Sequence, residues 1–223
     1  MVDFEFFREI IFPRLLDGTL MTILLIVLSL LPQVLIGILA AIGRVYGNKI
    51  ISRLSLAYVV FFRGTPLLIQ LFILYYGLPS IGIYLSPVFA AVTGFSLCGG
   101  AFQSEYVRGA IQSIKKGQMQ AALSLGLTRT GAILFVILPQ AMRRALPGLA
   151  NEITYLVKYS SLAFMITVIE LTGAGKIIAG RYFIYTYIFT LIAVIYLVLV
   201  TIVTRIQKRL EARLSYPGIV TGR

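Results

Sequence analysis

Two long segments without a charged residue constrain this chain more than any other feature of its sequence. Residues 18–43 and 182–204 hold 26 and 23 uncharged, mostly apolar residues. About 20 apolar residues in an α-helix cross a hydrocarbon core roughly 30 Å thick, because each residue advances the helix by about 1.5 Å. The mean hydropathy of +0.93 and the charged fraction of 13% agree, since about a quarter of residues in soluble domains are charged. The sequence therefore predicts an integral membrane protein.

Three further spans are predicted between these two. The 41 uncharged residues from Gly64 to Ser104 are too many for one helix, and prolines and a glycine at 79–87 favour a turn between two spans. A fourth span is less apolar because Glu152 and Lys158 interrupt it. The predicted fold is all-α integral membrane, with five transmembrane helices in one domain over residues 1–223. The predicted spans cover approximately residues 18–43, 54–78, 86–109, 145–169 and 182–204.

The distribution of Lys and Arg predicts the orientation of these spans. Basic residues are retained in the cytoplasm, and alternating the five spans places fourteen Lys and Arg on one side and four on the other. The N-terminus is therefore expected outside and the C-terminus in the cytoplasm. The four outer basic residues are Arg8, Arg14, Lys176 and Arg181. The net charge of +12 is explained by this asymmetry, so no nucleic acid partner is expected.

Missing residue types exclude most catalytic chemistry. The chain has no histidine and a single cysteine, Cys98, inside a predicted span. Disulfide, zinc and His-based nucleophile sites therefore lack their side chains. We expect no catalytic residue, no metal and no cofactor in this chain.

A short motif between the third and fourth spans has a demanding spacing. It reads Gln120-Ala121-Ala122, three residues, Gly126, nine residues, then Val136-Ile137-Leu138-Pro139. An ordinary amphipathic helix would share the small residues but not the whole spacing. The motif resembles the EAA loop of ABC importer permeases, with Gln120 and Val136 in place of Glu and Ile. The resemblance implies a cytoplasmic coupling helix within residues 112–139 that docks a separate ATPase, which would bind ATP and Mg.

Further segments narrow the resemblance to the polar amino acid permeases of ABC importers, the group that serves histidine, glutamine and arginine. Those segments are Arg63–Leu68, Gln70–Phe72, Glu105–Ile111 and Lys158–Leu162. Tyr159 and Ser160 depart from the usual Lys-Asp-Thr-Ser-Leu, which leaves fine specificity open. The resemblance implies a multi-pass protein of the prokaryotic inner membrane that pairs with a second copy or a homologue. It also implies two ATPase subunits, an extracytoplasmic amino acid binding protein and an amino acid substrate.

A polar stripe in the third span is a candidate substrate path. Thr93, Ser96, Gly100 and Gln103 fall at i, i+3, i+7 and i+10, and so share one helix face. Gly99 and Gly100 weaken the helix, and broken helices in transporters offer free N–H groups to a substrate carboxylate. Close packing of two membrane helices would need the same residues, and the sequence does not separate the two readings.

Glu152 is the sharpest substrate-binding candidate. An ionisable group in a span costs at least about 2.5 kcal/mol and normally faces a partner, a cavity or a substrate. Lys158 stands six residues away, whereas helical neighbours stand three or four apart. We therefore expect Glu152 to meet the ammonium or cationic side chain of an amino acid, or an arginine such as Arg143.

Other charges near the spans have structural explanations. Glu105 and Arg108, at i and i+3, are predicted to pair, and Arg63 is predicted to be structural or gating.

A different class of function remains open. A secondary transporter or channel driven by an ion gradient, without an ATPase, would also use an intramembrane carboxylate. Such folds often carry inverted repeats, and none is apparent here. A membrane enzyme is a more remote alternative because histidines are absent.

Overall fold

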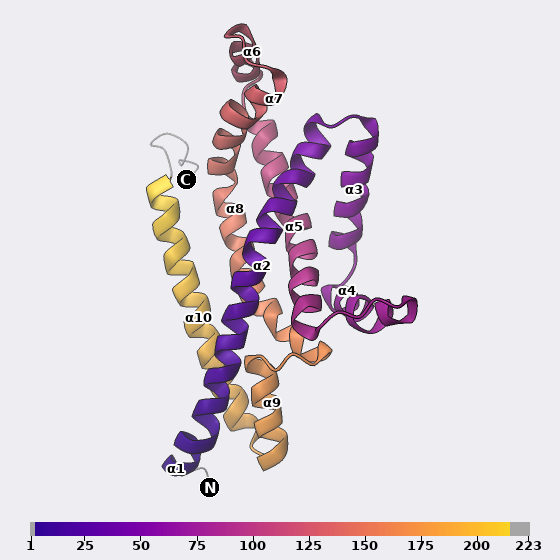
Figure 1. Cartoon of the computed structure of the whole chain (residues 1–223). Helices are drawn as coiled ribbons and strands as arrows, with labels where there is room; N and C mark the ends of the chain where they lie inside the picture. The colour runs from indigo at the N-terminus through magenta and orange to yellow at the C-terminus, as the bar shows by residue number, and fades with distance from the viewer. Residues whose placement is uncertain (1–2, 215–223) are drawn as a thin grey trace.

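The computed structural model describes residues 3–214, and nearly all of them are helical (Figure 1). The longer helices are α2 (Phe12–Tyr46), α3 (Lys49–Gly64), α5 (Pro87–Ser113), α8 (Leu138–Tyr159) and α10 (Tyr185–Leu214). The shorter α-helices are α1 (Phe4–Phe6), α4 (Leu67–Phe72), α6 (Lys116–Ser124), α7 (Arg129–Ala132) and α9 (Leu171–Tyr182). Phe7–Ile11, Ile73–Gly77 and Ile133–Ile137 are π-helical, and Leu78–Ile81 and Ser160–Ile166 are 3₁₀-helical. No strand occurs within the described range, so the all-α expectation is correct.

Helix α5 forms the centre of the bundle, between α2, α3 and α8. Small residues bring α2 and α5 close together. A Cβ added at Gly37 would lie 2.8 Å from the Cβ of Gln103, and one at Gly100 would lie 3.0 Å from the Cβ of Ile36. Because such contacts leave no room for a side chain, glycine at these two positions sets the helix separation.

Three helical runs within residues 3–214 are long and apolar enough to cross a membrane: Phe4–Tyr46, Arg129–Ile166 and Tyr185–Arg213. They contain the predicted spans at 18–43 and most of those at 145–169 and 182–204. Helix α5 covers the predicted span at 86–109 but is not among these apolar runs. Neighbouring helices bury about half of its residues, so it does not need an apolar surface toward lipid. The count of five spans stays a prediction.

The predicted span at 54–78 is not one straight helix but a pair of helical segments with a sharp bend between them. Helix α3 ends at Gly64, and the segment Leu67–Ile81 departs from its axis by 105°. Pro66 explains the break, because proline disfavours a helical conformation in the residue before it, and Thr65 is extended at φ −112° and ψ 144°. The segment containing α4 projects sideways at mid-height of the bundle (Figure 1).

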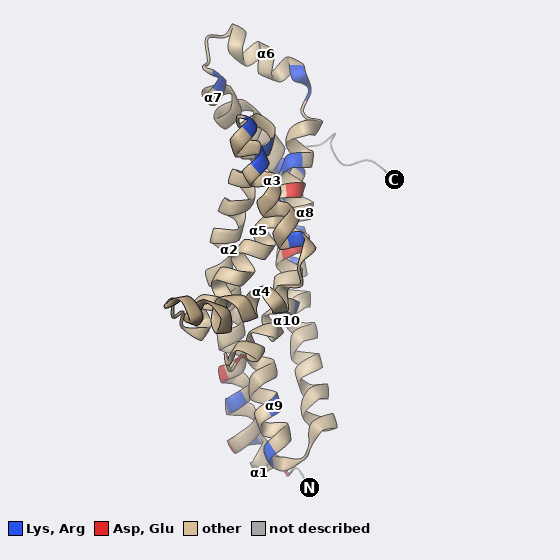
Figure 2. Ribbon diagram, turned by 90° about the vertical axis from the view of Figure 1, so that its right-hand side faces the viewer, with Lys and Arg blue, Asp and Glu red and all other residues tan. Residues whose placement is uncertain are grey.

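The two ends of the bundle differ. Helices α6 and α7 form one end, whereas α1 and the junction of α9 and α10 form the other (Figure 1). Charged residues lie mainly toward these two ends (Figure 2). Such a distribution leaves an apolar zone between them, as a protein that crosses a bilayer requires.

Candidate functional site

The Gln-Ala-Ala motif lies on α6, at the tip of the molecule. Lys115 precedes α6, and its side chain does not cap the helix. The turn that follows the helix contains Gly126. Gly126 has φ +86°, a left-handed conformation that glycine adopts without strain. The Gly126 N–H donates to the Leu123 carbonyl at 3.0 Å and the Leu127 N–H to the Ala122 carbonyl at 3.2 Å. This turn ends α6 and reverses the chain shortly after Gln120-Ala121-Ala122.

Helix α6 exposes apolar side chains at the end of the bundle. Ala122 is buried, whereas Gln120 and Ala121 are exposed. Leu123 is also exposed, and Leu125 is 84% exposed. These side chains lie on the loop that extends beyond the long helices (Figure 1), where lipid does not cover them in the predicted orientation. Exposed apolar residues in such a place are typical of a protein interface.

A cavity of about 440 Å³ lies beside α6. It is lined by the ends of α2 and α5 and by the start of α6, including Tyr46, Ile111, Lys115 and Gln120. The motif residue Gln120 therefore borders both the tip surface and this cavity.

Three arginines surround Glu105 below that end. The Arg108 Nη2 lies 2.7 Å from Glu105 Oε2, which confirms the predicted pair. Arg44 of α2 also pairs with Glu105, and the Arg63 Nη1 lies 3.9 Å from Glu105 Oε2. The Arg63 guanidinium stands 5.2 Å from the ring centroid of Phe102. One carboxylate thus ties α2, α3 and α5 together, and the three cations exceed its charge.

The polar stripe of α5 lies mainly in helix contacts. Gln103 is fully buried, and a Cβ at Gly37 would touch it. Ser96 is buried and its hydroxyl donates to the Val92 carbonyl at 2.6 Å, whereas Thr93 is partly exposed. The structure therefore favours the packing interpretation for Gln103 and leaves Thr93 accessible.

The expected weak point at Gly99 and Gly100 does not break the helix. Helix α5 is continuous from Pro87 to Ser113. A Cβ at Gly99 would collide with Gln33 Oε1, so this glycine makes room for a polar side chain of α2. The backbone N–H groups of both glycines lie inside a regular helix, where carbonyls of the preceding turn are their usual acceptors. A direct role of these N–H groups in binding would require the helix to open.

Glu152 of α8 is 1% exposed. The Tyr159 hydroxyl donates to Glu152 Oε1 at 2.9 Å. Arg63 lies near enough to attract it electrostatically. An arginine partner such as Arg143 stays a prediction for Glu152.

A second buried carboxylate, Glu170, accepts hydrogen bonds at both of its oxygens. It caps the start of α9, accepting from the N–H groups of Thr172 and Gly173 at 2.9 Å each. The Tyr196 hydroxyl donates to Glu170 Oε2 at 2.9 Å. A capping carboxylate at a helix N-terminus is stabilised by the helix dipole, so Glu170 has a structural role. Glu152 has one hydroxyl donor and no helix terminus, and its burial is less well compensated.

Sequence reasoning missed Tyr159 and Arg44 as partners of the two central carboxylates, and it missed Gln33. Gln33 and Gln103 are fully buried, and neither side-chain amide has a hydrogen-bond partner among the described residues. Gln33 carried a signal, because it is a large polar residue in the uncharged segment 18–43. Arg44 carried none, since it is separated from Glu105 by 61 positions.

Comparison with known proteins gives consistent relatives. The family described as binding-protein-dependent transport system inner membrane component matches residues 33–216. The probable amino-acid ABC transporter permease protein YckA of Bacillus subtilis (strain 168) is 45% identical over 174 residues, covering 78% of this chain and 77% of the relative. The glutamine transport system permease protein GlnP of Escherichia coli (strain K12) is 40% identical over 173 residues, covering 76% and 79%.

Solved structures agree with these relatives. A chain from a crystal structure of an amino acid ABC transporter with histidines has a TM-score of 0.84 and 32% identity, covering 96% of this chain and 99% of that one. A chain of the MetNI methionine ABC transporter, in inward-facing conformations, has a TM-score of 0.71 and 19% identity, covering 93% and 97%. The second likeness shows the fold alone.

Proposed function

This chain belongs to the family of binding-protein-dependent transport system inner membrane components, as a permease of the amino acid ABC transporter type. From this premise we propose that it imports polar, basic amino acids. Such permeases are transport components of the membrane and are not catalytic themselves. The family implies ATPase partners and a binding protein. The proposal adds the docking site, the substrate contact and the orientation.

The observation that carries the docking proposal is the surface of α6. Leu123 on α6 and Leu125 just after it are exposed at the end of the bundle, in a motif whose spacing resembles the EAA loop. Exposed leucines on the tip of a membrane protein are poorly placed for lipid and well suited to a groove on a soluble partner. We assign Gln120, Ala121, Ala122 and Gly126 to ATPase coupling, with α6 in the cytoplasm and the N-terminus outside.

The substrate proposal rests on Glu152. A buried carboxylate with a single hydroxyl donor is expensive unless a cation or a proton joins it, and an amino acid supplies a cation through its ammonium or basic side chain. Thr93 and Ser96 would contribute hydroxyls. Gly99, Gly100 and Gln103 would reach the substrate only when α2 and α5 separate, because they fill the contact between these helices in this conformation.

Alternating access would move these helices relative to one another. Two copies of the chain, or this chain and a homologue, would present two α6 helices to two ATPases, and closure of the ATPase dimer on ATP would push on both. Movement of α6 would pass to α5, which it follows after two residues, and so to the Glu105 cluster on α2, α3 and α5. A packed contact of this kind has discrete arrangements rather than continuous deformation.

The docking proposal is tested by introducing a charge at the tip. Leu125→Asp places a carboxylate on a side chain that is 84% exposed, so the fold should tolerate it while an apolar docking groove should not. We expect the ATPase to be lost from pull-downs of the variant. Phe4→Asp, at a position 78% exposed at the opposite end of the bundle, is the matched control and should retain the ATPase. Full retention of the ATPase by Leu125→Asp would contradict docking on α6.

A further inference from the structure

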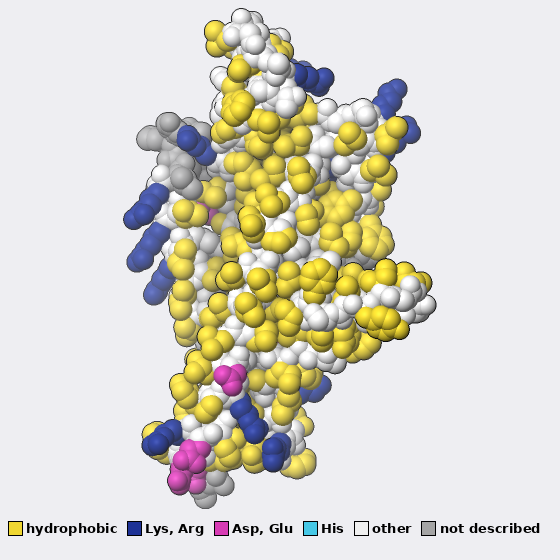
Figure 3. Space-filling model, in the orientation of Figure 1, with side chains coloured by type: hydrophobic (Ala, Val, Ile, Leu, Met, Phe, Trp, Pro, Cys, Tyr) yellow, Lys and Arg dark blue, Asp and Glu magenta, His cyan; other side chains and the backbone are white. Residues whose placement is uncertain are grey.

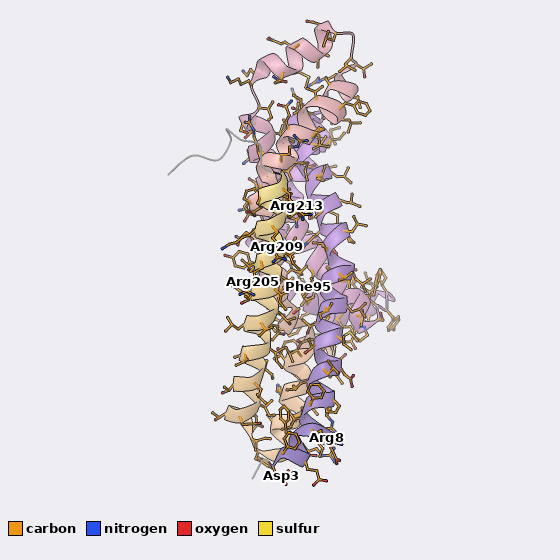
Figure 4. The ribbon with its side chains drawn as sticks, turned by 90° about the vertical axis from the view of Figure 1, so that its left-hand side faces the viewer. Asp3, Arg8, Phe95, Arg205, Arg209 and Arg213 are labelled. Carbon is orange, nitrogen blue, oxygen red and sulfur yellow. The ribbon has the colours of Figure 1, made fainter. Side chains whose placement is uncertain are left out.

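The cytoplasmic half of α10 carries a row of cations with no role in the site described above. Arg205, Lys208, Arg209 and Arg213 are all exposed. Arg205, Arg209 and Arg213 follow one another along the helix, and a row of Lys and Arg projects from the edge of the molecule over α10 (Figures 3 and 4). Within the part of the chain that the structure describes, no acidic side chain forms an ion pair with any of them.

One contact fixes the direction in which this row points. The Thr154 hydroxyl of α8 donates to Gln207 Oε1 at 3.0 Å, so Gln207 faces the bundle. Arg205 and Arg209 stand two positions before and after Gln207, which is a rotation of about 200° on an α-helix. They therefore point away from the protein. Glu211, four positions after Gln207, lies on the bundle side and does not neutralise them.

The same face of α10 is apolar one and two turns earlier. Val198 is 51% exposed and Ile202 is 49% exposed, and they lie about 180° and 140° around the helix from Gln207, on the side away from it. The face thus reads Val198, Ile202, Arg205, Arg209 at i, i+4, i+7 and i+11. It changes from apolar to cationic within a single turn, as a phospholipid changes from acyl chain to phosphate.

We propose that this face of α10 binds anionic phospholipid, with the acyl chains against Val198 and Ile202 and the phosphate held by Arg205 and Arg209. Guanidinium groups suit phosphate because they donate two parallel hydrogen bonds to it. Arg213, about 12 Å further along the helix than Arg205, reaches past the phosphate toward the headgroup substituent. The assignment requires only that this end of α10 lies at a membrane surface, and it does not depend on the substrate or on the ATPase.

Native mass spectrometry of the full-length chain, purified with the subunits it retains, tests this assignment. Phosphatidylglycerol and phosphatidylcholine with identical acyl chains are added at equal concentration, and the bound lipids are counted. Each Lys or Arg near an anionic surface contributes roughly a fivefold factor. Arg205→Gln combined with Arg209→Gln should therefore reduce the preference for phosphatidylglycerol by at least about tenfold.

The control removes two exposed arginines from the opposite end of the bundle, Arg8→Gln with Arg181→Gln, and should leave the preference unchanged. The unmodified protein adds a measurement that needs no variant, because a charge-based preference must fall as salt rises. An equal loss in both double variants, or a preference that ignores salt, would overturn the proposal. Loss of a protein subunit from the Arg205→Gln, Arg209→Gln variant with lipid binding intact would also overturn it, and would assign the row to a protein contact.

Discussion

Glu105→Gln should destabilise the bundle strongly, because one carboxylate pairs with three arginines from three helices. Glu105 accepts from Arg44 and from Arg108, whose Nη2 lies at 2.7 Å, and Arg63 stands at 3.9 Å. Glutamine keeps the shape of the side chain and one acceptor oxygen. It removes the charge and turns an NH₂ group toward the guanidinium groups, which then repel one another.

The magnitude follows from the two close contacts and their partial exposure. Hydrogen bonds to charged groups contribute about 1.5–3 kcal/mol each when buried. The Glu105 side chain is 20% exposed, so solvent screens part of this contribution, and fully exposed pairs contribute less than about 1 kcal/mol. We therefore expect a loss of about 2–4 kcal/mol. For a chain of this size, each kcal/mol lowers Tm by about 2–4 °C, so the expected fall is about 4–16 °C.

Thermal unfolding of the purified protein in detergent measures this fall. Glu9→Gln removes an exposed acid from the end of the bundle near α1 and is the control for a change in net charge. Adding Arg44→Gln to Glu105→Gln should recover part of the lost stability, because it removes one of the three repelling cations. A fall in Tm no larger than that of Glu9→Gln, or further loss on adding Arg44→Gln, would refute the role assigned to Glu105.

Three further predictions concern the tip, the carboxylate and the orientation. Gly126→Ala places a residue with a side chain in a left-handed conformation, which costs about 1–2 kcal/mol, and should weaken ATPase retention in pull-downs. Gly109→Ala, whose added Cβ would have no atom within 4 Å, is the control and should retain the ATPase. Glu152→Gln should weaken binding of a basic amino acid to the solubilised complex by at least about tenfold, with ATPase assembly unchanged; lost assembly at unchanged affinity would make Glu152 structural. In a Cys98-free background, Lys176→Cys, at an exposed position outside the predicted spans, should react with an impermeant thiol reagent from outside and Gln118→Cys should not, and the reverse pattern would invert the orientation.

The sequence predicted the parts of this fold that depend on long local patterns. Uncharged segments are visible without any structure, so the helices at 18–43 and 182–204 are present as expected. The motif with Gly126 was also visible, because its information lies in spacing along the chain. In contrast, α5 is covered by protein on most sides, and covered helices do not need the apolar surface by which spans are recognised.

The remaining features depend on contacts between segments far apart in the chain. Nothing in the sequence indicated that Arg44 would join Arg63 and Arg108 around Glu105, or that Gly99 would accommodate Gln33. The bend after Gly64 had a local cause in Pro66, but the surrounding run of apolar residues gave equal support to a continuous span. Tyr159 was noted only as a departure from a family motif, although it donates the hydrogen bond to Glu152.

Amino acid uptake by proteoliposomes tests the central claim most directly. The chain is reconstituted with its ATPase and its binding protein, and a radiolabelled basic amino acid is supplied on the side of the binding protein, with ATP on the side of α6. We predict accumulation that requires ATP, and loss of that accumulation when the ATPase carries a substitution of its Walker lysine. Uptake driven by an ion gradient without ATP, and unaffected by that substitution, would contradict the account and identify the chain as a secondary transporter.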